Sequence, residues 1–323
     1  MKHVALASFA ACGAAMLLAA CAPPGQAPRA LSLAPVNSSG APSVAELRAA
    51  TYSGLQGLPG PVTLTDGIWE GEPLAPGGVS RPSVSLAPGF RLTGDLDGDG
   101  RDEAVVVLAQ TSGGSGTVNY LAVVSRAASG PRNVATALLG DRVAIRSARI
   151  EGGQLLVSVV RAGKGDAMCC PGELADLGWT LSHGTLNPVA TGGGTGRLTL
   201  ATLAGTEWVL RAWDIGKPVP GEPEVTLTVQ GEKLSGTSGC NRYTATVKAD
   251  GAPGDLSIGP VASTRMACPE PQSSVEVRVL AQLGNARKFG FLLGQLAITY
   301  ELNGGSIGVM LFDARAPQGA PRP

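Results

Sequence analysis

The sequence lacks an excess of charge of either sign. Its 323 residues include 25 Lys and Arg against 25 Asp and Glu, and only 15% of the residues are charged. Proteins that bind nucleic acid or an anionic membrane surface use an excess of basic residues. The composition therefore predicts no nucleic-acid partner.

Histidine is almost missing, with His3 and His183 the only two. We expect His3 to be removed on export, so His183 alone remains. This excludes a zinc site built on several histidines and a pair of catalytic histidines, but not a single Ser-His-Asp arrangement. His183 lies in LSHGTLNP, which is typical of a strand end and turn, so we expect a solvated loop residue. There is also no G-x-S-x-G nucleophile motif, and we expect no enzymatic activity.

Patterns for long amphipathic helices are scarce as well. The 46 glycines and 24 prolines indicate many turns that join short strands. A chain of this length can bury two separate cores. We therefore expect a mainly β protein with two antiparallel β domains.

The N-terminus has the pattern of an export signal. Residues 1–3 form a short basic start, and residues 4–20 are uncharged and small or apolar, a run too short to span a membrane. Leu-Ala-Ala directly before Cys21 resembles the lipobox of a bacterial lipoprotein. The resemblance implies cleavage before Cys21 and lipidation of its thiol and amine. Because Ala22 follows instead of aspartate, it also implies an outer-membrane anchor that faces the periplasm.

Composition changes along the chain predict six segments. Pro, Ala and Ser dominate after the signal, short apolar runs alternate with turns in the middle, and a glycine cluster marks a boundary. The apolar run at residues 104–108 suits a strand buried on both faces of its sheet. The segments are a signal peptide (1–20), a tether (21–45), a β-rich domain (46–188), a Gly-rich linker (189–202), a second β domain (203–314) and a disordered tail (315–323).

The second β domain has one helical pattern. Ser273 and Glu276 have the spacing of a capping box, apolar residues follow on one helical face, and Gly284 is a typical C-terminal stop. Residues 291–300 and 306–312 predict a closing hairpin. We expect one short helix among strands.

Three segments of this part have a specific pattern: LAGTEWVL (203–210), GTSGCNRYTA (236–245) and IGPVASTRMACPE (258–270). Together they resemble a META domain of the HslJ-like kind. The resemblance implies a small, antiparallel, partly open barrel with one helix, often found in envelope lipoproteins linked to stress or drug tolerance. No established enzymatic activity comes with it.

Several residues of these segments have an expected structural role. Asn241 and Arg242 follow a turn, where polar side chains usually cap backbone groups; binding of an anion at the barrel mouth is the alternative. The spacing of five large residues predicts core and rim positions of strands: Trp208, Leu210, Tyr243, Met266 and Phe312.

Four cysteines remain after export and lipidation, an even number in an oxidising compartment. We expect a disulfide between Cys240 and Cys268, with a reactive thiol pair as the alternative. Cys169 and Cys170 are adjacent, and we expect a vicinal disulfide or structural thiols in a turn. The alternative is a soft-metal site for Cu(I) that includes Met168.

The segment GDLDGDGRDEAVVV, residues 94–107, spaces its acids like a calcium loop. Asp95, Asp97 and Asp99 take the first, third and fifth positions, Arg101 would offer its carbonyl at the seventh, and Glu103 takes the ninth. The glutamate at the twelfth position of an EF-hand is missing. The loop more closely resembles FG-GAP-like extracellular calcium repeats. We expect these five residues to bind calcium, with a plain hairpin turn as the alternative.

These expectations describe a non-enzymatic outer-membrane lipoprotein with a structural calcium site, which acts in envelope integrity, stress response or drug tolerance. The membrane, reached through the lipid on Cys21, is the partner that we expect. The alternative function is copper handling through Met168, Cys169 and Cys170.

Overall fold

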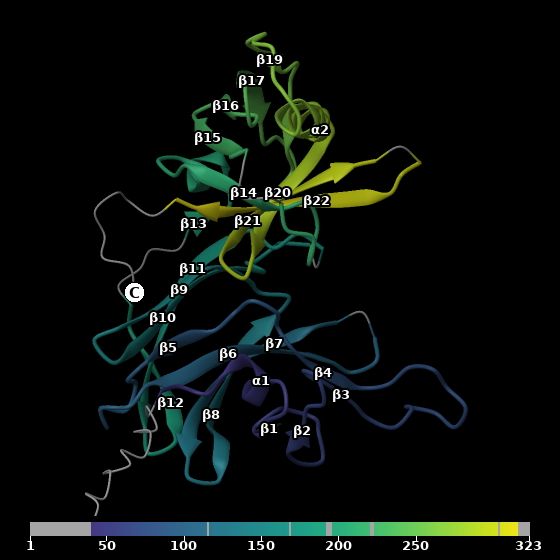
Figure 1. Ribbon diagram of the computed structural model, residues 1–323. Helices are drawn as coiled ribbons and strands as arrows, with labels where there is room; N and C mark the ends of the chain where they lie inside the picture. The colour runs from purple at the N-terminus through teal and green to yellow at the C-terminus, as the bar shows by residue number, and fades with distance from the viewer. Residues whose placement is uncertain are drawn as a thin grey trace, which may run out of the picture. The chain divides into compact units, whose positions relative to one another are not determined.

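The computed structural model describes residues 40–114, 116–167, 169–191, 196–219, 223–302 and 304–315 (Figure 1). The predicted signal peptide, Cys21, most of the predicted tether, Met168 and nearly all of the predicted tail lie outside these residues. The described residues belong to one compact unit. None of their helices is long and apolar enough to cross a membrane.

The protein is mainly β, as predicted, and its strands pair antiparallel. A first sheet has the order β3-β4-β6-β7-β8, with β5 paired to β6. A short helix and a two-stranded ribbon precede it in the chain. The elements are α1 (Val44–Leu47), β1 (Thr51–Tyr52), β2 (Val62–Thr63), β3 (Ile68–Glu70), β4 (Ser83–Leu86), β5 (Leu92–Gly94), β6 (Glu103–Thr111), β7 (Val118–Ala127) and β8 (Gly130–Asp141).

Both faces of β6 are buried, which confirms the prediction for residues 104–108. Val105 and Val107 belong to a core shared with the second sheet. Ala104 and Val106 face a separate core that contains residues from α1, β1 and β2. The continuous apolar run thus reflects two cores, one on each side of the strand.

The start of the described chain is fixed to the first sheet through α1. Ser43 and Glu46 form a capping box at its N-terminus. Glu46 also pairs with Arg126 on β7, with oxygen–nitrogen distances of 2.5 and 2.6 Å. The Arg126 guanidinium, together with Ser43, lowers the pKa of Glu46 to about 2.

A second sheet has the order β12-β11-β10-β9, with β13 paired to β11. Its apolar face packs on the first sheet, since Leu155, Val157 and Trp179 join the same core as Val105 and Val107. The two sheets form a sandwich, visible in the lower half of Figure 1. The strands are β9 (Ala144–Glu151), β10 (Gln154–Arg161), β11 (Glu173–Ser182), β12 (Thr185–Val189) and β13 (Gly196–Arg197).

A third sheet forms the C-terminal part, in the order β18-β17-β16-β15-β14-β22-β21-β20, with β19 paired to β17. The 3-10 helix η1 (Leu200–Leu203) precedes it, at the end of the predicted linker and the start of the predicted second β domain. The remaining elements are β14 (Trp208–Ala212), β15 (Thr226–Gln230), β16 (Lys233–Thr237), β17 (Arg242–Lys248), β18 (Ser257–Ile258), β19 (Ala262–Ser263), α2 (Gln272–Gly284), β20 (Ala286–Leu292), β21 (Gln295–Glu301) and β22 (Ile307–Ala314).

This sheet curls into a nearly closed barrel. The segment before β18 returns to β20, where Asp255 forms a bridge with Lys288 and the Leu256 amide donates to the Arg287 carbonyl at 2.8 Å. Val279 and Leu283 of α2 enter the barrel core. The arrangement is the antiparallel barrel with one helix that the sequence predicts.

Several local predictions in the barrel need correction. α2 begins after Pro271 without the predicted capping box, because Ser273 donates to Glu270 and Glu276 accepts hydrogen bonds from another segment. The predicted strand 291–300 contains a turn, so β20 ends and β21 begins within it. Met266 is 59% exposed and lies outside the strands, whereas the other four predicted core residues are buried: Trp208, Leu210, Tyr243 and Phe312.

Candidate functional site

The acidic loop lies between β5 and β6. The carboxylates of Asp95, Asp97 and Asp99 converge, with one oxygen from each within 4.8 Å of the others. The loop backbone supports this arrangement: the Gly98 and Gly100 amides donate to Asp95 at 2.7 and 3.0 Å. Three oxygens of this kind suit a hard cation such as calcium.

The other two predicted ligands, Arg101 and Glu103, do not belong to this group of carboxylates. Glu103 is 2% exposed, starts β6 outside the carboxylate group, and accepts from the Leu96 amide at 2.9 Å. Its burial, together with repulsion from the aspartates, raises the pKa of Glu103. The Arg101 guanidinium pairs with Asp99 at 2.7 Å and lowers the pKa of that carboxyl. The structure thus brings together three of the four predicted acids.

His183 lies in the turn between β11 and β12, and its side chain is exposed there. It adopts a positive φ of 50° next to Gly184, which also has a positive φ. Such a turn geometry suits a two-residue hairpin connection.

Cys169 and Cys170 are both free thiols, so the vicinal disulfide predicted as one alternative is not formed. Cys169 is exposed and Cys170 is half-buried. The Lys288 ammonium lies 3.8 Å from the Cys170 sulfur. The neighbouring Cys169 thiol and burial raise the pKa of Cys170, while Lys288 opposes this shift. Met168, the third member of the predicted copper site, lies outside the described residues.

Cys240 and Cys268 form a disulfide, as predicted, with their Cα atoms 6.2 Å apart. The bridge joins the segment before β17 to the segment before α2. It therefore links two of the three META-like segments through cysteines that are 28 residues apart in the chain.

Asn241, next to this disulfide, is 2% exposed and uses its whole side chain inside the protein. Its Oδ1 accepts from the Thr264 hydroxyl at 2.7 Å and from the Met266 amide at 2.9 Å. Its Nδ2 donates to the Glu276 carboxylate at 2.9 Å and to the Met266 carbonyl at 3.2 Å. No atom of the side chain is left for an anion, so Asn241 has the backbone-capping role. The Arg242 side chain is exposed.

Glu276 contacts Ser238 and Asn241 and does not form the capping box with Ser273 that its spacing predicts. Its carboxylate accepts from the Ser238 hydroxyl at 3.1 Å and from the Asn241 amide at 3.2 Å, in addition to the Asn241 side chain. Ser238 is completely buried. Glu276 thereby joins α2 to the β16–β17 connection. The sequence signal for such a contact is a charged residue next to the apolar face of the predicted helix.

Comparison with known proteins gives a family match for the C-terminal region. The META domain family model matches residues 201–310. The search of curated proteins gave no match. Among solved structures, the chain is similar to the NMR structure of the protein from Burkholderia xenovorans, with 28% identity and a TM-score of 0.29. That match covers 41% of this chain and 98% of the other.

Proposed function

We propose, from the META domain at residues 201–310, that the protein is a non-enzymatic outer-membrane lipoprotein that acts in envelope integrity, stress response or drug tolerance. The META match is the observation that carries the proposal, because it supports a stress-related or envelope-associated protein. We further propose that the domain is of the HslJ-like kind, on the segments around Cys240 and Cys268.

Two features support export and lipidation. The first is the signal pattern that ends at Cys21, with small residues directly before the cysteine. The second is the Cys240–Cys268 disulfide, since such bridges persist in oxidising compartments outside the cytosol. Together they favour a mature chain attached to the membrane through Cys21.

A cell-based comparison tests this proposal. A strain without the gene is complemented with wild-type protein or with Cys21→Ser, which cannot be lipidated. We expect wild-type protein in the outer-membrane fraction and the variant outside it, because only the lipid anchor holds the chain there. We also expect wild-type protein alone to restore growth in detergent. Equal fractionation of both proteins would contradict the anchor, and unchanged detergent sensitivity without the gene would contradict the envelope role.

The acidic loop adds a structural calcium site to the proposal. The convergent carboxylates of Asp95, Asp97 and Asp99 support it, as does the resemblance to FG-GAP-like loops. The loop leads directly into β6, the strand buried on both faces. A cation that offsets the repulsion among the carboxylates would stabilise the entry into this strand.

Calcium is expected to raise the melting temperature of the EDTA-treated protein. At a calcium concentration about 100 times the Kd, binding to the folded state contributes about 2.7 kcal/mol, which corresponds to roughly 5 °C or more. The measurement is a thermal scan with and without calcium. Asp97→Asn is expected to remove the shift, whereas Asp102→Asn is the matched control, since Asp102 is exposed and outside the carboxylate group. An identical melting temperature with and without calcium would refute the site.

Metal analysis of the natively purified protein separates calcium from the second candidate function, copper handling. The observation that favours this candidate is that Cys169 and Cys170 are unbonded thiols, available to a soft ion. Copper that disappears in Cys169→Ser plus Cys170→Ser would support it, and copper that survives these substitutions would rule it out.

A further inference from the structure

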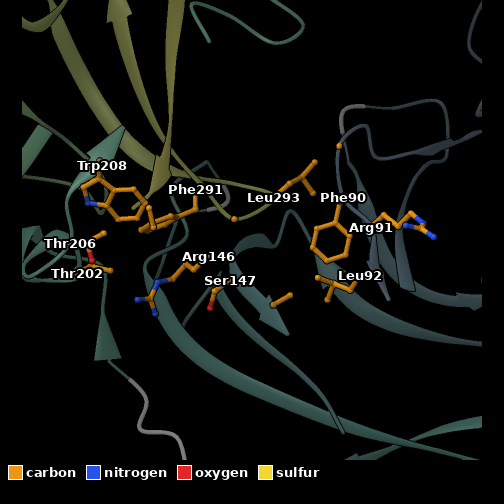
Figure 2. Close-up of a pocket in the computed structure, with 14 residues that line it drawn as sticks. Phe90, Arg91, Leu92, Arg146, Ser147, Thr202, Thr206, Trp208, Phe291 and Leu293 are labelled. Carbon is orange, nitrogen blue, oxygen red and sulfur yellow. The ribbon is translucent and has the colours of Figure 1, made fainter. Parts of the chain in front are cut away.

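A pocket of about 430 Å³ lies between the second sheet and the barrel (Figure 2). Its walls come from β9, η1, β14, β20 and the segment before β5. The turn after β20 helps to close it, because the Gly294 amide donates to the Ile145 carbonyl of β9 at 2.9 Å. Its volume is typical of sites that bind small molecules.

The pocket lining combines aromatic and polar side chains. Trp208 and Phe291 form a tilted pair with ring centroids 6.2 Å apart, and Phe90 lines the wall across from them (Figure 2). The Thr202 and Thr206 side chains also line the pocket. The lining residues include no acidic side chain among those that the structure describes.

Arg146 brings a positive charge into this pocket without a matching negative one. Its guanidinium lies 5.5 Å from the centre of the Phe291 ring. Its Nε is fully buried, and no atom of the described residues accepts its hydrogen bond. An unpaired buried donor on a charged group costs free energy that a bound acceptor would recover. Arg146 is therefore in place for a negatively charged ligand.

Arg91 also lines the pocket but has a different role. Its Nε donates to the Pro42 carbonyl at 3.0 Å, and Figure 2 shows its guanidinium turned away from Trp208 and Phe291. The pocket lining thus contains two arginines: the Nε of Arg146 has no acceptor among the described residues, and the Nε of Arg91 donates to the backbone.

We propose that this pocket binds a small organic anion with a flat apolar body, such as an aromatic carboxylate or sulfonate. The anionic group accepts hydrogen bonds from the Arg146 guanidinium, with the threonine hydroxyls as further donors. Trp208, Phe291 and Phe90 are mostly covered by the protein core, and the apolar body contacts the parts of their rings that line the pocket. This site is separate from the acidic loop and does not depend on it.

Two matched probes test the proposal on the full mature chain. Anilinonaphthalene sulfonate carries the anionic group, and phenylnaphthylamine has the same rings without it. We expect saturable binding of the sulfonate at one site per chain, and binding of the neutral probe at least about tenfold weaker. Arg146→Gln is expected to weaken sulfonate binding about tenfold or more, whereas Arg91→Gln leaves it within about twofold.

A measurement on the wild-type protein keeps the test independent of folding of the variants. The side-chain Nε–H signal of Arg146, identified by its loss in Arg146→Lys, is expected to shift when the sulfonate is added and to stay in place with the neutral probe. Equal affinity for both probes, an unmoved Arg146 signal, or equal binding by the Gln variants at positions 146 and 91 would each overturn the proposal. So would the failure of the sulfonate to bind.

Discussion

Asn241→Ala is expected to lower the free energy of unfolding of the protein by about 3 to 5 kcal/mol. The substitution removes a buried side chain that makes four hydrogen bonds to Thr264, Met266 and Glu276. It leaves the Met266 amide without its partner and deprives the Glu276 carboxylate of its closest donor. A hydrogen bond contributes about 0.5 to 1.5 kcal/mol, and one to a charged group about 1.5 to 3 kcal/mol, so the loss of these four bonds accounts for the expected change.

Chemical denaturation measures this loss, and hydrogen exchange of the β17 amides reports on the C-terminal barrel. Arg242→Ala is the control, because Arg242 is the next residue and its side chain is exposed. We expect the control to change the free energy by less than about 0.5 kcal/mol. A loss below about 1 kcal/mol for Asn241→Ala would contradict the central role given to this residue.

Removal of the Cys240–Cys268 disulfide by alanine at both positions is expected to cost about 3 to 4 kcal/mol, because the open chain gains the entropy of a 28-residue loop. The measurement is the same denaturation experiment under non-reducing conditions. The bridge also lies beside Asn241, whose Nδ2 is 3.3 Å from the Cys268 sulfur.

The other pair of cysteines provides the control. Cys169→Ala plus Cys170→Ala changes the same number of sulfurs, but these thiols are free and at least partly exposed. We expect this double variant to lose less than about 1 kcal/mol. Equal losses for the two double variants would show that the disulfide contributes nothing beyond the side chains themselves.

The sequence predicts those features that depend on local pattern. The apolar run of β6 identifies a strand buried on both faces, because two cores require apolar residues at successive positions. The META-like segments predict the barrel and its helix, and the even number of cysteines after export predicts a disulfide. The spacing of the acidic loop predicts that Asp95, Asp97 and Asp99 converge, since alternate residues of a tight loop point to one centre.

The remaining features depend on contacts between distant residues. Glu276 has capping-box spacing from Ser273, yet it binds Asn241, which is 35 residues away. The turn between β20 and β21 is hidden by Leu293, an apolar residue with a positive φ of 52° that packs on the sandwich core. Arg146 and Trp208 meet at one pocket only because the second sheet and the barrel pack together. A local sequence pattern does not predict such contacts between distant residues.

The mass of the mature N-terminal peptide, from protein purified out of the native membrane fraction, tests the central claim most directly. The account predicts a peptide that begins at Cys21 and carries diacylglycerol on its thiol and an acyl chain on its amine. A chain that still begins at Met1, or one that begins at Cys21 without lipid, would contradict it.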